Sequence, residues 1–402
     1  MTDVQHNQLV QGSLQAPVNK KDIRIRRWVA RLDRELDGIL DKVSALVRQE
    51  SPTSHSDAVH AAQGMVGAWV EELGGGVKWH VRSGSGGVLE ARFGKSDGSR
   101  RPVLLLGHLD TVWPVGTLAR MPWRVEDGWA YGPGVLDMKA GVVMALTAMK
   151  LVREVDADSP AVLLLSGDEE TGSRHSRELI EEVAKDCRAA FVLEPAQGPQ
   201  GAYKTARKGV GQFRLEITGV PSHSGVDFGA GHSAVRELAW QIEQISALTD
   251  LERGTTLNVG VVGGGTQSNV VAASAWAEID LRVTNLADAE AVTRRLQALK
   301  ARDPQCTLRL TGGLNRPPME RTPGTAALFE QAKGLAADLG FALEEAATGG
   351  GSDGNFTSAL GVPTLDGMGA VGKGAHADNE SIRIDSLAPR TALLAAMIAT
   401  SQ

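Results

Sequence analysis

Cysteine is almost missing from this chain of 402 residues, which contains only Cys187 and Cys306. The two cysteines lie far apart in unlike sequence contexts, so neither a disulfide framework nor a zinc site built on thiolates is expected. A metal ion in this protein would therefore have to be held by His, Asp and Glu. An excess of basic residues is missing as well, since the formal net charge is -6. That balance argues against nucleic acid as a partner.

Long apolar runs are also missing. No stretch approaches the roughly 20 apolar residues that a membrane-spanning helix needs, so no membrane contact is expected. Residues 1–27 are largely polar and lack the apolar run of a signal peptide. We interpret them as a flexible leader and expect the protein to be cytoplasmic.

The signatures of two common enzyme classes are not found either. No G-x-S-x-G elbow follows a predicted strand, which argues against a serine hydrolase. No G-x-G-x-x-G lies between a predicted strand and a helix, which argues against a Rossmann-type dehydrogenase.

The chain does contain the pattern of an α/β protein. Its length suggests two domains or more, and its 47 glycines fit many tight turns between strands and helices. Helical spacing of apolar residues begins near Trp28. Continuous apolar runs then alternate with helical segments, as in VLLLGH (103–108), AVLLLSG (161–167) and AFVLEP (190–195). Such runs are typical of a mostly parallel sheet that is covered by helices on both faces.

The pattern changes between Val210 and Arg316. GQFRLEITG (211–219) alternates apolar and polar residues, as a half-exposed strand does. The expected order of elements in this segment is β-α-β-β-α-β, the order of a ferredoxin-like module. After it the first pattern returns. We therefore expect a large domain of residues 28–209 and 317–402, into which residues 210–316 are inserted.

Ionisable residues follow several of the predicted strands and turns. Ligands of open α/β sheets bind at the carboxyl ends of the strands, so we expect these side chains to meet there. Taken singly, each has a structural explanation, such as a hydrogen-bonded histidine or an acidic helix cap. Together they would repel one another unless a cation lay among them. These residues are His108, Asp110, Asp137, Glu169, Glu170, Glu194 and His376.

Two histidines and at least three carboxylates suit zinc or a similar divalent ion. They exceed the three protein ligands that are typical of one catalytic zinc, which favours two ions bridged by one carboxylate. A carboxylate that is not a ligand should stand beside the attacking water as general base. The adjacent Glu169 and Glu170 offer one residue for each role.

The motifs GHLDTV, YGPGVLDMKAG, SGDEETGS, LEP, PSHSG and GAHADNE resemble, in content and in order, those of the dinuclear-zinc exopeptidases and amidohydrolases. This family includes carboxypeptidase G (glutamate carboxypeptidase), succinyl-diaminopimelate desuccinylase, acetylornithine deacetylase and aminoacylase. The motifs are most similar to those of the glutamate carboxypeptidase branch, and the resemblance covers nearly the whole chain from about Trp28. It implies an α/β dizinc domain that is interrupted by a ferredoxin-like lid and dimerisation domain.

The resemblance implies the metal ligands residue by residue. Asp137 would bridge the two ions. His108 and Glu194 would complete one site, although many relatives have aspartate at the position of Glu194. Glu170 and His376 would complete the other site. The ions would be Zn²⁺, and Co²⁺ or Mn²⁺ suit the same ligands.

Two further residues would act beside these ligands. Asp110 would hydrogen-bond His108 and fix its tautomer. Glu169 would be the general base. The resemblance also implies a cis peptide bond between Asp137 and Met138.

The inserted module and a later loop would contribute contacts to the substrate. His223 in PSHSG would reach into the active site of a dimer partner and stabilise the oxyanion. Asn269 and Arg316 would contact the substrate carboxylate, which a guanidinium binds through two parallel hydrogen bonds. For Arg282 a structural ion pair is an equal alternative. The loop of residues 348–355 would line the substrate channel through its glycines, Gly350 and Gly351 among them.

The expected substrate is a small molecule or short peptide with a free carboxylate. We expect hydrolysis of an amide or peptide bond that releases a C-terminal amino acid, with glutamate as a candidate. A deacylase of N-acyl amino acids or a hydrolase of aromatic amides is an alternative within the same family. A non-catalytic metal-binding relative is a remote alternative. The resemblance further implies a homodimer that forms through the lid domain.

Overall fold

The computed structural model describes residues 20–81, 84–95 and 100–400, so most of the leader predicted at residues 1–27 lies outside the described residues. The part of the leader that is described is helical, because α1 (Lys20–Arg34) begins before Trp28. The apolar spacing therefore predicted the start of this helix too late. Charged residues dominate the first two turns of α1, and the regular apolar spacing begins only at Trp28.

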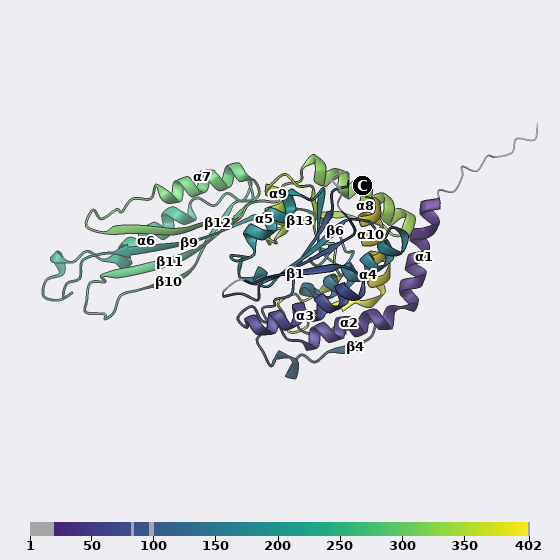
Figure 1. Cartoon of the computed structure of the whole chain (residues 1–402). Helices are drawn as coiled ribbons and strands as arrows, with labels where there is room; N and C mark the ends of the chain where they lie inside the picture. Colours follow the sequence, from purple (N-terminus) through teal and green to yellow (C-terminus); the bar gives the residue numbers. More distant parts are fainter. Residues whose placement is uncertain (1–19, 82–83, 96–99, 401–402) are drawn as a thin grey trace, which may run out of the picture.

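A mixed six-stranded sheet forms the centre of the larger part of the molecule (Figure 1). Strands β6, β3, β7 and β14 pair in parallel, whereas β1 and β2 pair antiparallel at one edge. The apolar runs therefore predicted the parallel centre correctly but not the antiparallel edge. In spatial order the strands are β1 (Gly76–His80), β2 (Val88–Phe93), β6 (Ala161–Ser166), β3 (Val103–His108), β7 (Ala189–Val192) and β14 (Thr364–Leu365).

Helices cover both faces of this sheet. Leu104 and Leu106 of β3 pack on one face with residues of α5 (Arg177–Lys185) and α9 (Gly354–Ala359). Leu105 points to the other face and its larger core. A strand buried on both faces needs the continuous apolar run seen at residues 103–106. The larger core also contains residues of α1, α2 (Leu36–Arg48), α3 (Ser56–Glu72), α4 (Ala140–Val155), α8 (Pro323–Leu339) and α10 (Leu387–Thr400).

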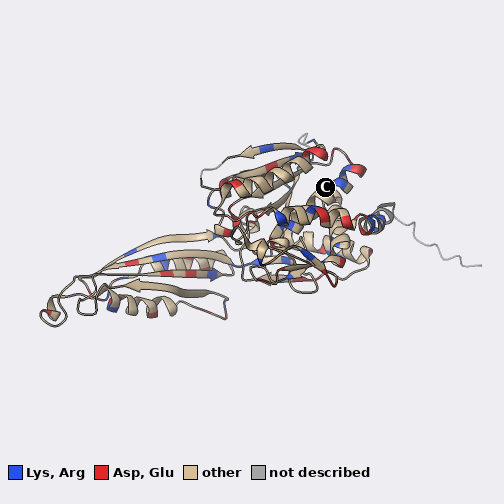
Figure 2. Ribbon diagram, turned by 90° about the horizontal axis from the view of Figure 1, so that it is seen from below, with Lys and Arg blue, Asp and Glu red and all other residues tan. Residues whose placement is uncertain are grey.

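A smaller part of the molecule projects from this body and has an apolar core of its own (Figure 1). Its four strands pair antiparallel in the spatial order β10-β11-β9-β12. Alternate residues of β9 and β11 are buried with α6 and α7, and the residues between them face the opposite way. Acidic and basic residues are interspersed along these strands (Figure 2). The chain order is β9 (Gly209–Thr218), α6 (Ala234–Ser246), β10 (Thr256–Gly264), β11 (Ser274–Val283), α7 (Leu286–Gln297) and β12 (Thr307–Arg316).

Short strands that the sequence analysis did not predict complete the fold. β8 (Tyr203–Arg207) pairs in parallel with β13 (Glu345–Thr348). Another sheet joins the segment after His376 to the segment before Asp137, through pairing of β16 with β5. Strands of two or three residues are too short to show a period in the sequence. In spatial order this sheet contains β15 (Gly372–Lys373), β16 (Ser381–Arg383), β5 (Trp129–Tyr131) and β4 (Arg124–Glu126).

None of the helices within the described residues is both long enough and apolar enough to cross a membrane.

Candidate metal centre

The parallel strands bring the predicted site residues to one end of the sheet. His108 is the last residue of β3 and lies in register with Ser166, the last residue of β6. Glu169 and Glu170 follow β6 in a single helical turn. Glu194 follows β7, which pairs with β3 on its other side. The carboxyl ends of neighbouring strands thus meet, as the sequence predicted.

Asp137 lies between two groups of potential metal ligands. In one group, His108 Nε2 is 3.2 Å from Asp137 Oδ1 and 3.6 Å from Glu194 Oε1. In the other group, His376 Nε2 is 3.4 Å from Asp137 Oδ2 and 3.2 Å from Glu170 Oε2. The ligand atoms of each group all lie within 4.8 Å of one another. Each oxygen of Asp137 therefore faces one group, which is the arrangement that a bridging carboxylate needs.

The donor set fits divalent cations. Glu170 Oε1 is buried and has no hydrogen-bond partner among the described residues, which is unfavourable unless a cation compensates it. Hydrogen bonds to Asp137 and Glu170 raise the pKa of His376 to about 10. Burial alone would lower the pKa of His108, but hydrogen bonds to carboxylates, that of Asp110 first, raise it well above its usual range. The cluster thus attracts positive charge, and its imidazole and carboxylate donors suit zinc and similar ions.

Asp110 joins two of the strand ends. Its carboxylate accepts hydrogen bonds from the backbone amides of Glu169 (3.2 Å) and Glu170 (3.1 Å) and from Thr53 Oγ1 (2.8 Å). His108 Nδ1 lies 3.0 Å from the backbone oxygen of Asp110 and 3.5 Å from its carboxylate. The structure therefore places Asp110 beside His108. It also shows a contact that the sequence did not indicate, because Asp110 holds the turn that carries both glutamates.

Glu380, which the sequence analysis missed, holds the segment that carries Asp137. Its buried carboxylate accepts four hydrogen bonds and so fixes the backbone before the cis peptide bond between Asp137 and Met138. The cis bond is the one that the resemblance implied. Glu380 lies in the same GAHADNE motif as His376, and this position in the motif could have identified it. The donors are the amides of Gly134 (2.8 Å), Leu136 (2.8 Å) and Asp137 (3.0 Å) and the Trp113 indole (2.7 Å).

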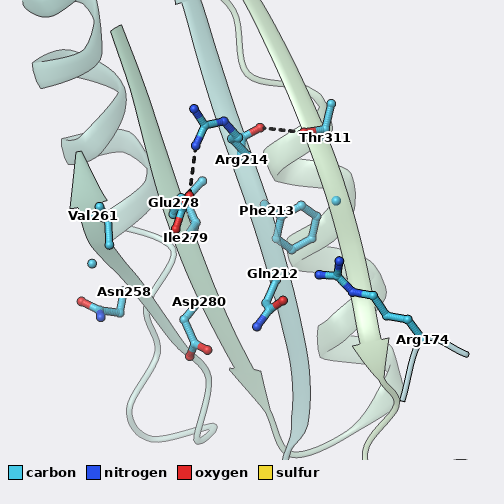
Figure 3. Close-up of a pocket in the computed structure, with 12 residues that line it drawn as sticks. Arg174, Gln212, Phe213, Arg214, Asn258, Val261, Glu278, Ile279, Asp280 and Thr311 are labelled. Carbon is cyan, nitrogen blue, oxygen red and sulfur yellow. Dashed lines mark hydrogen bonds and ion pairs between the residues drawn. The ribbon is translucent and has the colours of Figure 1, made fainter. Parts of the chain in front are cut away.

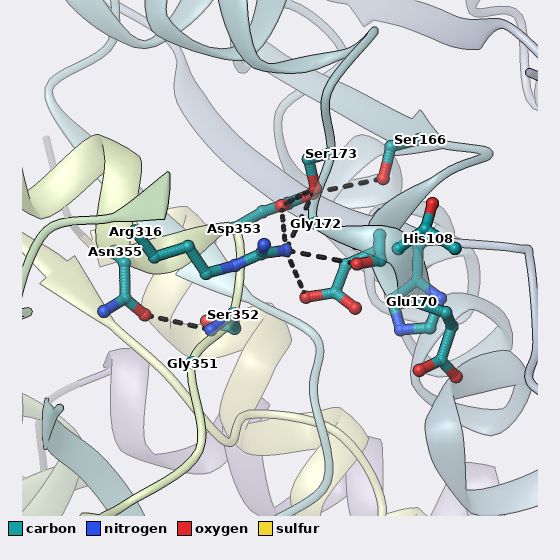
Figure 4. A network of polar contacts seen from close by, with 12 residues as sticks. His108, Ser166, Glu170, Gly172, Ser173, Arg316, Gly351, Ser352, Asp353 and Asn355 are labelled. Carbon is teal, nitrogen blue, oxygen red and sulfur yellow. Dashed lines mark hydrogen bonds and ion pairs between the residues drawn. The ribbon is translucent and has the colours of Figure 1, made fainter. Parts of the chain in front are cut away.

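Arg316 is buried and binds carboxylates of the protein itself (Figure 4). Its Nη2 lies 2.6 Å from Glu169 Oε1 and 2.9 Å from Asp353 Oδ1, and it also donates to Ser173 Oγ at 3.0 Å. Its Nη1 donates to Asn315 Oδ1 at 3.0 Å. Burial raises the pKa of Glu169 well above its usual range, and the charge of Arg316 opposes this shift. The guanidinium thus holds one oxygen of the predicted general base in place.

A cavity of about 300 Å³ opens beside this network. Arg282 reaches it from β11, where its guanidinium makes a two-point ion pair with Asp280 at 2.9 Å for both contacts. The structural ion pair considered for Arg282 is therefore present. The cavity is lined by residues from both parts of the molecule, including Glu169, Glu170, Gln212, Arg282, Arg316 and His376.

The glycine-rich loop after β13 packs against Arg316. A Cβ atom at Gly351 would lie 2.8 Å from Arg316 Cδ, so this close approach requires glycine. The carbonyl groups of Gly350 and Gly351 accept hydrogen bonds from Arg207 at 3.1 Å and 3.2 Å. Arg207 was not identified from the sequence. It also pairs with buried Asp366 at 2.7 Å, and its Nη2 is 3.9 Å from a carboxylate oxygen of the metal cluster.

His223 and Asn269 lie next to each other but away from the cluster. The backbone of His223 pairs with the residue that follows Asn269. Both lie beyond the far end of β9, whose near end pairs Val210 with Arg316. From Val210 to Thr218 the strand spans roughly 26 Å at about 3.3 Å per residue. The structure of one chain therefore does not bring these two residues to its own metal ligands.

A model of the peptidase family M20/M25/M40 matches residues 104–400. The chain belongs to this family. Carboxypeptidase G2 of Pseudomonas sp. (strain RS-16) is 29% identical over 372 residues, which cover 90% of this chain and 89% of the relative. A succinyl-diaminopimelate desuccinylase of Cereibacter sphaeroides is 30% identical over 327 residues, which cover 76% of this chain and 84% of the relative.

A solved structure of an aminopeptidase has the same fold. Aminopeptidase PepT from Bacillus cereus ATCC 10987 superposes with a TM-score of 0.76 at 22% sequence identity, covering 91% of this chain and 98% of the other. Membership of the M20/M25/M40 family confirms the resemblance drawn from the motifs. The protein is accordingly a metal-dependent hydrolase of amide bonds.

Proposed function

We propose that this hydrolase releases a C-terminal amino acid, with glutamate as the first choice, from an N-acyl or peptidyl substrate. The observation that carries the proposal is the pair of ligand groups that share Asp137, with Glu169 and Arg316 beside them. The similarity to carboxypeptidase G2 over most of both chains supports carboxypeptidase chemistry.

Two divalent ions, zinc as first choice, would be held by the two ligand groups. When bound, such ions polarise the scissile carbonyl and activate a water molecule near neutral pH. The protein contributes a rigid frame for the ligands, because Asp110 holds one strand end and Glu380 holds the bridging segment. The ligands would be His108, Asp137, Glu170, Glu194 and His376.

Glu169 would act as the general base. It belongs to neither ligand group, and Arg316 occupies only its Oε1. Its Oε2 would take a proton from the attacking water and later deliver it to the leaving amine. Because burial raises the pKa of Glu169, the carboxylate is a stronger base than an exposed one.

The free carboxylate of the substrate would bind at Arg316. The guanidinium lines the cavity beside the metal centre, where a substrate carboxylate would add to its contacts with Glu169 and Asp353. Gly351 lines the same cavity, and Gly350 precedes it in the loop that would form the substrate channel. Arg282, which also lines the cavity, would add positive charge there.

We further propose that residues 210–316 form a ferredoxin-like lid and dimerisation domain on a catalytic domain of residues 28–209 and 317–402. The separate apolar core and the antiparallel strand order support this division. In a homodimer, His223 and Asn269 of one subunit would reach the metal centre of the other and stabilise the oxyanion and the substrate carboxylate. This would account for their distance from the cluster of their own chain. The cytoplasmic location stays a prediction.

A deacylase of small N-acyl amino acids is the second candidate. The similarity to succinyl-diaminopimelate desuccinylase supports it, and the same metal centre would serve both reactions. The two candidates differ in which side of the scissile bond the enzyme selects.

Product identification by mass spectrometry tests the proposal. Purified protein is given a pooled library of N-acyl amino acids and dipeptides, with added zinc and, in parallel, with a chelator. We expect zinc-dependent release of glutamate or a similar C-terminal residue from many acyl groups. Release that depends on one small acyl group and tolerates many amino acids would instead establish the deacylase. Hydrolysis that persists undiminished with the chelator would contradict both candidates.

A further inference from the structure

Arg207, the last residue of β8, carries a buried positive charge near the metal centre. Its guanidinium makes a two-point ion pair with Asp366, at 2.7 Å for both contacts, and Asp366 is fully buried. Burial alone would lower the pKa of Arg207, but the carboxylates of Asp366 and Glu194 raise it, so the guanidinium stays charged. Because an uncompensated charge is costly in a protein interior, each member of such a pair depends on the position of the other.

The five N–H groups of this guanidinium are directed to different partners. Nε and one N–H of Nη2 bind Asp366, whereas Nη1 donates to the carbonyl groups of Gly350 at 3.1 Å and Gly351 at 3.2 Å. The second N–H of Nη2 remains, and this nitrogen lies 3.9 Å from Glu194 Oε2. The other oxygen, Glu194 Oε1, lies 3.6 Å from His108 Nε2. One oxygen of Glu194 therefore faces the guanidinium and the other faces the group of potential metal ligands.

The same ion pair also holds the glycine-rich loop of residues 348–355. Ser352 Oγ donates a hydrogen bond of 2.6 Å to Asp366 Oδ2, the oxygen that also binds the guanidinium Nε. Gly351 packs so closely on Arg316 that a Cβ atom would lie 2.8 Å from Arg316 Cδ. The buried pair thus connects the carboxylate of Glu194 with the loop that lines the cavity beside the metal centre.

We propose that Arg207 is a positioning residue that couples the metal centre to the glycine-rich loop. The inference rests on the proposed function, in which Glu194 is a metal ligand. Nη2 of Arg207 holds Oε2 of Glu194, so that Oε1 is presented to a cation. A bound cation in turn fixes Glu194 and, through the guanidinium, the loop. Coupling between two sites is reciprocal, so loss of Arg207 affects both zinc binding and the order of the loop.

Zinc affinity tests one side of this coupling. The double variant Arg207→Met, Asp366→Asn removes both charges of the pair, so that no buried carboxylate is left unpaired. We expect it to weaken zinc binding, measured by chelator competition, by about 10–100-fold, the effect of losing a residue that orients a ligand. The loss should persist when Glu170→Gln removes a ligand of the other group. It should vanish when Glu194→Gln removes the ligand that Arg207 orients.

An ion pair on the projecting sheet provides the matched control. Arg214 binds Glu278 at 3.0 Å, both side chains are partly exposed, and they border a cavity of about 450 Å³ (Figure 3). Arg214 lies roughly 13 Å along β9 from Val210, which lines the cavity beside the metal centre. The double variant Arg214→Met, Glu278→Gln also removes one charge of each sign and should keep the zinc affinity of the wild-type protein.

Hydrogen exchange of the loop amides tests the other side of the coupling. In the wild-type protein, zinc should slow the exchange of residues 348–355 by up to the same factor, because the coupling is reciprocal. Arg207→Lys keeps the charge and a partner for Asp366, but one ammonium group cannot bind Asp366, the loop and Glu194 together. In this variant zinc should no longer slow the exchange of the loop. Because both charges remain, the coupling is tested even if the double variant does not fold.

Three outcomes would overturn the proposal. Zinc affinity and loop exchange that match those of the wild type in the Arg207 variants would remove the coupling, although loss of zinc in Glu194→Gln would still support the ligand assignment. A loss caused by the Arg207 variants that is just as large in the Glu194→Gln background would show that Arg207 acts on the fold as a whole. Unchanged zinc affinity in Glu194→Gln itself would overturn the ligand assignment and, with it, the coupling.

Discussion

Glu169 and Glu170 are neighbours in the sequence, but their side chains have different partners. Glu170 Oε2 lies 3.2 Å from His376, whereas Glu169 Oε1 lies 2.6 Å from Arg316. Both residues belong to a single 3₁₀ turn, whose successive side chains point about 120° apart. The residues alone indicated that one glutamate is a ligand and the other a base. Only the resemblance to a family distinguished them, because the direction of each side chain depends on the turn and on Arg316, which is distant in sequence.

The two glutamates should therefore respond differently to the same substitution. Glu169→Gln should lower kcat by about 10²–10⁴-fold, the contribution of a general base, and keep the bound zinc. Glu170→Gln should lose zinc, because an amide is a poor substitute for a carboxylate ligand. Steady-state kinetics and zinc analysis after dialysis measure the two effects. Equal loss of zinc in both variants would contradict the separation of roles.

At the scale of elements, the sequence predicted most of the long helices and strands and missed the short strands. VLLLGH is continuous and apolar because β3 is buried on both faces, and GQFRLEITG alternates because β9 is buried on one face. β5 and β16 have only three residues each, so neither pattern can appear in them. Yet the pairing of these two strands places Glu380 next to the segment that carries Asp137, so that its carboxylate can accept hydrogen bonds from the backbone of that segment. This contact could not be predicted from the sequence, because it depends on strands too short to show a period.

The contact between these elements predicts a role for Glu380. Glu380→Gln replaces one of two acceptor oxygens by an NH₂ group that faces N–H donors. Leaving buried donors unpaired should reduce the free energy of unfolding by about 1–3 kcal/mol. Loss of a residue that orients a ligand should also weaken zinc binding by roughly 10–100-fold. Chelator competition and chemical denaturation measure the two quantities.

Glu345→Gln is the control for this variant. Glu345 is partly exposed and pairs with Arg321 at the surface, where an ion pair contributes about 0–1 kcal/mol. The zinc affinity of the Glu345→Gln variant should equal that of the wild-type protein. Unchanged zinc affinity in Glu380→Gln as well would mean that the bridging segment keeps its conformation without this carboxylate.

At the scale of the whole molecule, the metal centre lies at one end of β9, and His223 with Asn269 lies beyond the other. The sequence placed all of them in one functional set, but it could not show this separation, which results from the length of β9, a strand of ten residues. Exposed apolar side chains gather in the same distal part, where Val226 and Phe228 are 82% and 68% exposed. Large exposed apolar residues favour an interface with another protein surface. In the proposed homodimer, a second copy related by a twofold axis would cover this end, and His223 would lie near the partner's metal ligands.

Two inactive variants should therefore restore each other if the dimer shares its active sites. Glu169→Gln keeps His223, and His223→Ala keeps Glu169, so a mixed dimer contains one centre with both residues intact. Equal amounts, denatured and refolded together, should recover about a quarter of the wild-type activity, because half of the randomly formed dimers are mixed and each has one complete site. The matched control replaces the His223→Ala partner by the double variant Glu169→Gln, His223→Ala, which supplies no complete site in any combination and should stay inactive. Mixtures that remain as inactive as their components, although sedimentation shows mixed dimers, would place the action of His223 within its own chain or outside catalysis.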